Sequence, residues 1–165
     1  MIVISGTMGS GKTTVLSEAS DILSSSGVVH AAIDLDGLGI CQLPAGLADD
    51  LMFRNLASVW ANYRAAGVTR LLLAEAVASA ADLDRIRDAV PNAEVVVCRL
   101  TTSLETAQHR VRLREPGMLQ DKFVARVPEL ERILDDGDLE DFSIENEHVS
   151  VTDVAREMLI RAGWL

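Results

Sequence analysis

The chain is poor in cysteine and in aromatic residues, and it contains no long hydrophobic run. Its two cysteines, Cys41 and Cys98, form no C-x-x-C pair and have no histidine at metal-ligand spacing, so we expect two reduced thiols. No apolar stretch approaches the roughly 20 residues that a membrane span needs. Residues 1–4 lead directly into a glycine-rich segment, which leaves no room for a signal peptide. These absences predict a cytoplasmic location.

Positive charge is also scarce. The 165 residues include 15 Lys and Arg against 25 Asp and Glu, which gives a formal net charge of −10. Nucleic acids and anionic membranes both bind basic surfaces, so we expect neither as a partner. With 48% hydrophobic and 24% charged residues, the composition is that of an ordinary globular protein. The length and the lack of repeats or linkers predict a single domain over residues 1–165.

Short apolar runs alternate with longer amphipathic stretches along the chain. Continuous apolar runs suit strands that are buried on both faces of a parallel sheet. The expected strands are residues 1–5, 28–33, 70–74, 94–100 and 142–144, with an extension of the last towards Val149 as the alternative. The expected helices are residues 12–25, 47–66, 81–89, 103–115, 120–134 and 153–161. This β-α-β-α order predicts an α/β fold, a parallel sheet with helices on both faces.

Several local signals refine these elements. Thr102 followed by Glu105 matches a capping box for the helix after the fourth strand. Pro128 falls inside the next helical pattern and predicts a kink or a split there. The acidic segment 135–138 is expected to form a solvated turn.

The strongest motif lies at the end of the first strand. Gly6, Gly11, Lys12 and Thr13 match the phosphate-loop pattern G-x-x-x-x-G-K-[ST] between a strand and a helix, as its mechanism requires. Glycines let successive backbone N–H groups turn towards phosphate oxygens, and the helix N-terminus adds a positive dipole. We expect ATP and Mg²⁺ to bind here, with the Thr13 hydroxyl as the metal ligand. The predicted nucleotide-binding residues are Gly6, Met8, Gly9, Ser10, Gly11, Lys12, Thr13 and Thr14.

The phosphate loop alone does not identify a reaction. Residues 34–37 spell D-x-x-G, but no N-K-x-D follows, which disfavours a GTPase and favours ATP. A transporter-type L-S-G-G-Q signature is missing as well.

Several further patches resemble the small-molecule and nucleotide kinases among phosphate-loop proteins, particularly gluconate kinase and adenylylsulfate kinase. The patches are residues 33–37, Arg54-Asn-Leu, Arg99-Leu-Thr-Thr with the arginines that follow it, 118–123 and 151–155. The chain is also similar to actinobacterial ATP-binding proteins of unassigned function. The resemblance implies a three-layer α/β/α fold with a five-stranded parallel sheet in the order 2-3-1-4-5. It also implies a short lid near residues 115–120.

Carboxylates that follow the second and third strands are the candidate acceptor-site residues. Asp34 and Asp36 come at the carboxyl edge of the sheet, where either could orient or deprotonate an acceptor hydroxyl. We favour Asp36 as the base and Asp34 as a ligand of substrate or of Mg²⁺-bound water, although a solvated pair remains the alternative. Glu75 interrupts an apolar run, so it either faces the crevice or is paired. Arg54 is a candidate ligand for the substrate.

Arginines after the fourth strand are the candidate phosphate clamp. Arg110 and Arg114 stand four residues apart and share a helical face, whereas Arg112 points away. Two guanidinium groups near a lid could stabilise the charge that develops on the transferred phosphoryl group. The alternative is an amphipathic helix with a solvated basic side.

The sequence therefore predicts an ATP-dependent kinase that transfers the γ-phosphoryl group to a hydroxyl or phosphate of a small molecule. The catalytic residues would be Lys12, Asp36, Arg110 and Arg114, with Asp34, Arg54 and Glu75 near the acceptor. Two other functions stay open, a nucleotide-binding sensor or regulatory module and a simple NTPase. The acceptor is not identified by the sequence.

Overall fold

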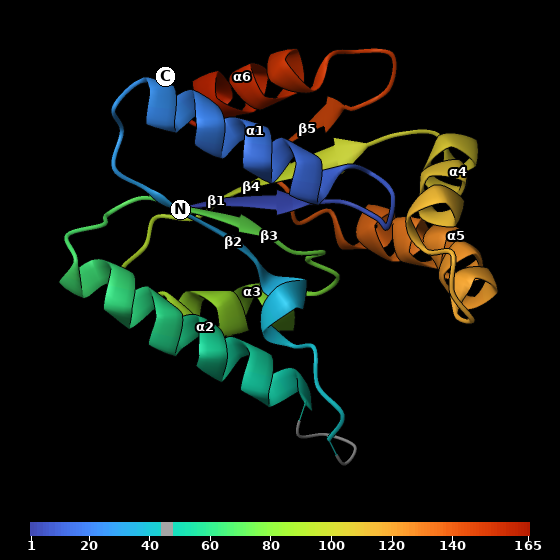
Figure 1. Ribbon diagram of the computed structural model, residues 1–165, viewed down its shortest axis with the longest axis horizontal. Coiled ribbons are helices and arrows are strands. Elements are labelled where there is room, and N and C mark those ends of the chain that lie inside the picture. Colours follow the sequence, from blue (N-terminus) through green and yellow to red (C-terminus); the bar gives the residue numbers. More distant parts are fainter. Residues whose placement is uncertain (44–47) are drawn as a thin grey trace.

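Five parallel strands form the centre of the protein, which is described here by a computed structural model covering residues 1–43 and 48–165 (Figure 1). The strands are β1 (Ile2–Ser5), β2 (Ala31–Asp34), β3 (Leu71–Ala74), β4 (Val96–Thr101) and β5 (Phe142–Glu145). Their order in the sheet is β2-β3-β1-β4-β5, and every neighbouring pair is parallel. This confirms the predicted sheet order.

Within the described residues, five α-helices and one 3-10 helix lie between the strands, and a sixth α-helix follows β5. They are α1 (Lys12–Ser25), η1 (Leu35–Leu38), α2 (Ala48–Ala65), α3 (Ala80–Ala89), α4 (Leu104–Arg114), α5 (Gln120–Gly137) and α6 (Val151–Arg161). The expected start of α2 at Leu47 lies outside the described residues. None of the described helices is both long and apolar enough to cross a membrane.

Alternate residues of β1 enter two separate cores, one on each face of the sheet. Ile2 and Ile4 pack with α1 and α6, whereas Val3 packs with α2 and α3 on the opposite face. Figure 1 shows the same layers, with α1 and α6 on one side and α2 and α3 on the other. The pair α4 and α5 lies apart from these layers, beyond the ends towards which the strand arrows point. It forms a small core of its own around Val111 and Val127. The result is the predicted three-layer α/β/α fold.

Two expectations were wrong, one about the end of β5 and one about the N-cap of α4. β5 ends at Glu145 and does not extend towards Val149, because His148 adopts a positive φ of 59° that an extended strand cannot contain. The N-cap of α4 is Ser103, whose hydroxyl accepts from the Thr106 amide at 3.2 Å. The Thr102 hydroxyl instead donates to Glu147 at 3.1 Å.

Hydrogen bonds to Glu147 explain why Ser103, and not Thr102, is the N-cap of α4. Its carboxylate accepts hydrogen bonds from the Thr106 hydroxyl, the Ser103 amide and the Ser103 hydroxyl, in addition to Thr102. These donors stabilise the charged form and lower the pKa of Glu147 to about 2. A residue from the β5–α6 connection thus holds the start of α4.

Helix α5 is not split at its proline. It remains one helix through Pro128. Proline has no N–H, so the carbonyl of Val124 loses its normal helical donor. The side-chain amide of Gln108 on α4 donates to that carbonyl at 3.3 Å. Asp135 lies within this helix and not in a solvated turn, because it pairs with Arg99 of β4 at 2.6 Å.

Candidate active site

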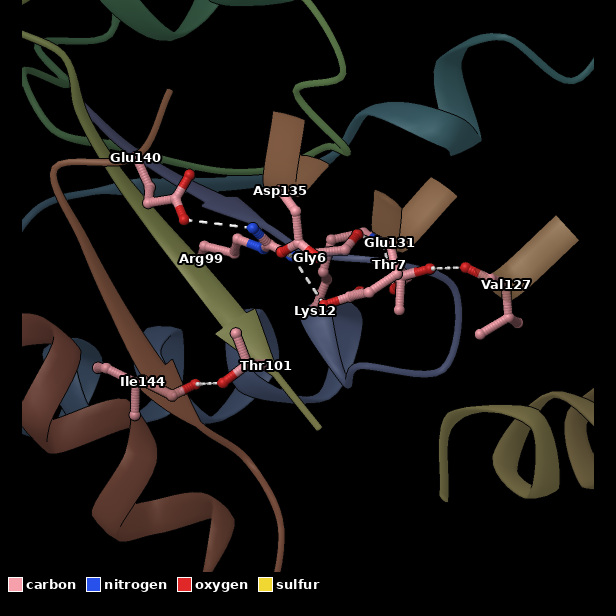
Figure 2. A network of polar contacts seen from close by, with 10 residues as sticks. All are labelled: Gly6, Thr7, Lys12, Arg99, Thr101, Val127, Glu131, Asp135, Glu140 and Ile144. Atoms are coloured by element: carbon pink, nitrogen blue, oxygen red, sulfur yellow. Dashed lines mark hydrogen bonds and ion pairs between the residues drawn. The ribbon is translucent and has the colours of Figure 1, made fainter. Parts of the chain in front are cut away.

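The phosphate loop arches from the end of β1 to the start of α1. The Nζ atom of Lys12 turns back over it and donates to the carbonyls of Gly6 at 2.8 Å and Thr7 at 3.2 Å (Figure 2). Gly9 and Gly11 have φ values of 80° and 99°, which side-chain-bearing residues rarely adopt. A Cβ on Gly9 would also collide with the Ala107 carbonyl of α4. The glycines are therefore required by both backbone conformation and space.

Three segments distant in sequence support the loop. The side-chain amide of Asn146, just after β5, donates to the Ser10 carbonyl at 2.7 Å. Arg110 donates to the Gly9 carbonyl at 3.3 Å. The Thr7 hydroxyl donates to the Val127 carbonyl of α5 at 3.2 Å, a contact visible in Figure 2. The loop is thus held in shape by β5, α4 and α5 together.

A cavity of about 370 Å³, here called the phosphate-loop cavity, opens over this arch. It is lined by Met8, Gly9, Gly11, Lys12, Thr13, Thr14, Asp36, Arg110 and Arg114. Most of the predicted nucleotide-binding and catalytic residues thus share one cavity. Gly6 and Ser10 belong to the loop but are buried and do not line the cavity.

The two predicted clamp arginines are both present at the cavity. A second nitrogen of Arg110 donates to the Asn146 carbonyl at 3.0 Å, so this side chain is fixed by two backbone oxygens. Arg114 pairs with the adjacent Glu115 at 2.9 Å and is half exposed. Arg112 is exposed and outside the cavity, as its spacing predicted. Phosphate binding by this pair stays a prediction.

Thr13 and Asp34 form a direct contact. The Thr13 hydroxyl donates to Oδ2 of Asp34 at 2.6 Å, which brings a hydroxyl and a carboxylate oxygen to the end of the phosphate loop. Mg²⁺ in phosphoryl-transfer sites takes one or two protein oxygens and completes its shell with water and phosphate oxygens. Within residues 1–43 and 48–165, no group of three or more His, Cys, Asp or Glu side chains could hold a metal ion by itself. The donor set at Thr13 therefore fits Mg²⁺ bound together with a nucleotide.

Lys12, Asp36 and Glu75 form an electrostatically coupled group. Burial lowers the pKa of Lys12, against the opposing effect of Asp36 and Glu75. Burial, with the nearby charge of Asp36, raises the pKa of Glu75 to about 8. Oε2 of Glu75 is buried and has no hydrogen-bond partner among the described residues. Glu75 does not line the phosphate-loop cavity, so its predicted place near the acceptor stays a prediction.

A second cavity of about 610 Å³ lies against α5, and we call it the α5 cavity. It shares Met8, Lys12 and Asp36 with the phosphate-loop cavity. Asp36, positioned by η1 after β2, therefore faces both spaces. Asp34, although only two residues away, lines neither and contacts Thr13 instead. Arg54 is exposed on α2 and lines neither cavity, so its role as a substrate ligand stays a prediction.

Sequence reasoning did not predict the structural roles of two residues that shape the site. Asn146 had no motif to mark it. Arg99 is a charged residue inside an otherwise apolar strand and is only 4% exposed, a signal that could have been followed. Its guanidinium donates to Glu131 at 2.7 Å, Asp135 at 2.6 Å and Glu140 at 3.3 Å (Figure 2). The pairs with Glu131 and Asp135 attach α5 to β4, and the pair with Glu140 attaches the connection that follows α5.

Comparison with known proteins gives matches at the level of structure alone. No protein-family model matches the sequence, and no curated protein matches it either. A gluconokinase from Sinorhizobium meliloti aligns with a TM-score of 0.61 and 19% identity, over 96% of this chain and 89% of that one. The APS kinase of Mycobacterium tuberculosis in complex with AMPPNP and APS gives 0.64 and 19%, over 98% and 96%.

A shikimate kinase from Acinetobacter baumannii in complex with shikimate aligns with a TM-score of 0.64 and 20% identity, over 99% of this chain and 94% of that one. All three matched proteins are small-molecule kinases by name, and two of them belong to the types named from the sequence. The resemblance is confirmed for the fold. The chain therefore has the three-layer fold of the phosphate-loop kinases.

Proposed function

We propose that this protein is an ATP-dependent kinase that phosphorylates a small molecule. The observation that carries the proposal is the position of Asp36, whose side chain lines both the phosphate-loop cavity and the α5 cavity. A kinase needs such a group between the donor phosphate and the acceptor. The fold shared with gluconokinase, shikimate kinase and APS kinase supports the same reaction class.

The residues divide the work of phosphoryl transfer. The loop amides, Lys12 and the arginines Arg110 and Arg114 bind and neutralise the phosphates of ATP. Thr13, with Asp34 behind it, would hold Mg²⁺, which when bound offsets negative charge on the β- and γ-phosphates. Lys12 releases the carbonyls of Gly6 and Thr7 when its ammonium group turns to the phosphates.

Asp36 acts on the acceptor. The acceptor oxygen forms a bond to the γ-phosphorus while the bond from that phosphorus to the β,γ-bridging oxygen breaks, and ADP leaves with that oxygen. The hydroxyl proton passes to the Asp36 carboxylate and then to water. Glu75, protonated below a pKa of about 8, adds no second negative charge beside Asp36 at neutral pH.

The test is ADP release over a panel of hydroxyl- and phosphate-bearing small molecules, with Mg²⁺ present. At least one acceptor is expected to raise ADP release at least about tenfold above the rate with ATP alone. Asp36→Asn should lower the acceptor-dependent kcat by about 10²-fold or more while leaving the Kd for ATP within about threefold.

The matched control is Glu145→Gln, an exposed carboxylate on β5 outside both cavities, which should leave kcat unchanged. Tight ATP binding without any acceptor dependence would overturn the proposal in favour of a nucleotide sensor. Steady hydrolysis that no acceptor accelerates, and that Asp36→Asn leaves intact, would identify a simple NTPase.

A further inference from the structure

The wall of the α5 cavity is mainly apolar. Besides Met8, Lys12 and Asp36 at the phosphate loop, its lining consists of Ala76, Lys122, Phe123, Ala125, Arg126, Glu129 and Leu130. Phe123 and Leu130 belong to α5, and Ala76 follows β3. A volume of about 610 Å³ lies within the usual range for small-molecule sites. Polyhydroxylated compounds fit such a wall badly, because each hydroxyl that loses water without gaining a partner costs free energy.

The polar groups of this cavity are divided between two places. Lys12 and Asp36 are shared with the phosphate-loop cavity, whereas Lys122, Arg126 and Glu129 are exposed on α5. Arg126 and Glu129 pair with each other at 2.5 Å, which leaves the Lys122 ammonium as the uncompensated charge of the α5 group. The chain contains only two lysines, Lys12 and Lys122, and both line this cavity.

We propose that the acceptor is an alcohol with an apolar ring or chain as its body and one acidic group at its far end. Its hydroxyl lies at Asp36, its body lies on Phe123, Ala125 and Leu130, and its acidic group lies at Lys122. This inference rests on the proposed function, because it places the acceptor in the space that adjoins the phosphate loop through Met8, Lys12 and Asp36.

Direct binding to the whole protein with Mg·AMPPNP present tests the proposal without requiring turnover. The probe is 4′-(hydroxymethyl)biphenyl-4-carboxylate, and the comparator is D-gluconate. Each carries one carboxylate and a primary alcohol, so the main difference is an apolar or a polyhydroxylated body. Titrations followed by ligand-observed NMR should give a Kd for the biphenyl alcohol at least about tenfold lower than that for gluconate. An equal or tighter Kd for gluconate would overturn the proposal.

Two variants locate the probe. Ala125 is exposed and lines the cavity, so Ala125→Glu places a charge on the apolar wall without disturbing a core. It should weaken the biphenyl probe at least about tenfold. The control Ala81→Glu makes the same change at an exposed position of α3 and should leave the Kd within about twofold. An equal Kd in wild type and Ala125→Glu would mean that the probe binds elsewhere, which rejects the proposed site.

Lys122→Met tests the acidic end of the acceptor. It should weaken the biphenyl carboxylate about fivefold or more and leave the neutral 4-(hydroxymethyl)biphenyl unchanged. Equal effects on both compounds would reject the assignment of Lys122. Failure of this inference can be distinguished from failure of the proposed function. Phosphorylation of gluconate-like acceptors alone would support the proposed kinase activity and reject the apolar acceptor. Binding of the probe at this site without phosphorylation of any acceptor would retain the apolar site and reject the kinase.

Discussion

The side-chain amide of Asn146 donates a 2.7 Å hydrogen bond to the carbonyl oxygen of Ser10, and so connects the end of β5 to the phosphate loop. The two residues are 136 positions apart, and the Asn146 side chain also occupies the space beside Gly11 where a Cβ would lie. With its own carbonyl Asn146 accepts from Arg110. One residue thus aligns the loop and one of the predicted clamp arginines.

Replacing Asn146 should therefore impair nucleotide binding as well as stability. Asn146→Asp substitutes an acceptor for the donor that Ser10 requires and adds a negative charge beside the phosphates. We expect the Kd for ATP to rise at least about tenfold and the free energy of unfolding to fall by about 1–3 kcal/mol. Isothermal titration with ATP and urea unfolding measure the two effects. Glu145→Gln on the neighbouring residue is the control, and unchanged ATP affinity in Asn146→Asp would contradict the assigned role.

The contact between Thr13 and Asp34 predicts a specific change in metal dependence. Asp34→Asn retains a hydrogen-bonding group beside the Thr13 hydroxyl but removes the negative charge. We expect the Mg²⁺ concentration that half-saturates ATP binding to increase by about tenfold, with a smaller effect at saturating Mg²⁺. A Mg²⁺ titration of ATP binding measures this. Asp21→Asn, at an exposed position of α1, should behave as wild type, and an identical shift in both variants would refute the prediction.

Glu75 predicts a pH dependence of stability. Its pKa is raised from the ordinary value of 4.5 to about 8, so between these values the folded protein binds more protons than the unfolded chain. Stability must then fall as the pH rises through this range, and the loss is complete above about pH 8. Glu75→Gln stays neutral throughout. Urea unfolding at pH 5.5 and pH 8.5 should show wild type losing at least about 1 kcal/mol more than the variant.

The comparison between wild type and Glu75→Gln isolates the contribution of Glu75 to the pH dependence, since every other titrating group is common to both. Parallel changes in the two proteins would show that Glu75 is already ionised in the folded state at low pH. A larger loss in the variant than in wild type would have the wrong sign and would also reject the assignment.

The Gln108 amide and Pro128 predict a non-additive pair of substitutions. Gln108→Leu should cost about 1 kcal/mol, because it leaves the Val124 carbonyl without a donor. In a Pro128→Ala background the backbone N–H at position 128 can serve that carbonyl, so Gln108→Leu should cost less than half as much. Urea unfolding of the four proteins completes the double-mutant cycle. The same cost in both backgrounds would show that Gln108 does not compensate for the proline.

Much of the fold could be predicted because it depends on local patterns. The apolar runs of β1 and β3 are long enough to distinguish buried strands from loops, and the start of α1 follows directly from the phosphate-loop motif. The errors arose where a distant residue decides. Thr102 and Ser103 are both suitable caps, and Glu147 selects between them from 44 positions away. Pro128 is tolerated within α5 because Gln108, which belongs to α4, donates to the Val124 carbonyl that the proline leaves without a donor.

In the candidate site too, residues of a local motif were predictable and residues placed by distant segments were not. Lys12 and Thr13 belong to one short motif, so their places were predictable. The roles of Asp34 and Asp36 were not separable from spacing alone, because the 3-10 helix η1 turns Asp36 towards the cavities while Asp34 stays at Thr13. The α5 cavity could not be predicted from the sequence, because it is assembled from α5, the end of β3 and the phosphate loop.

The carboxylates of α5 that pair with Arg99 lie in its second half, at Glu131 and Asp135. The first half carries Lys122 and Phe123 and adjoins the connection to α4. The first half is held as well, because Gln108 of α4 donates to the Val124 carbonyl and the Gln120 side chain donates to the carbonyls of Arg112 and Glu115. Helix α5 therefore joins the sheet at Arg99 to the helix that carries Arg110 and Arg114, so the two predicted clamp arginines and the wall of the α5 cavity share one support.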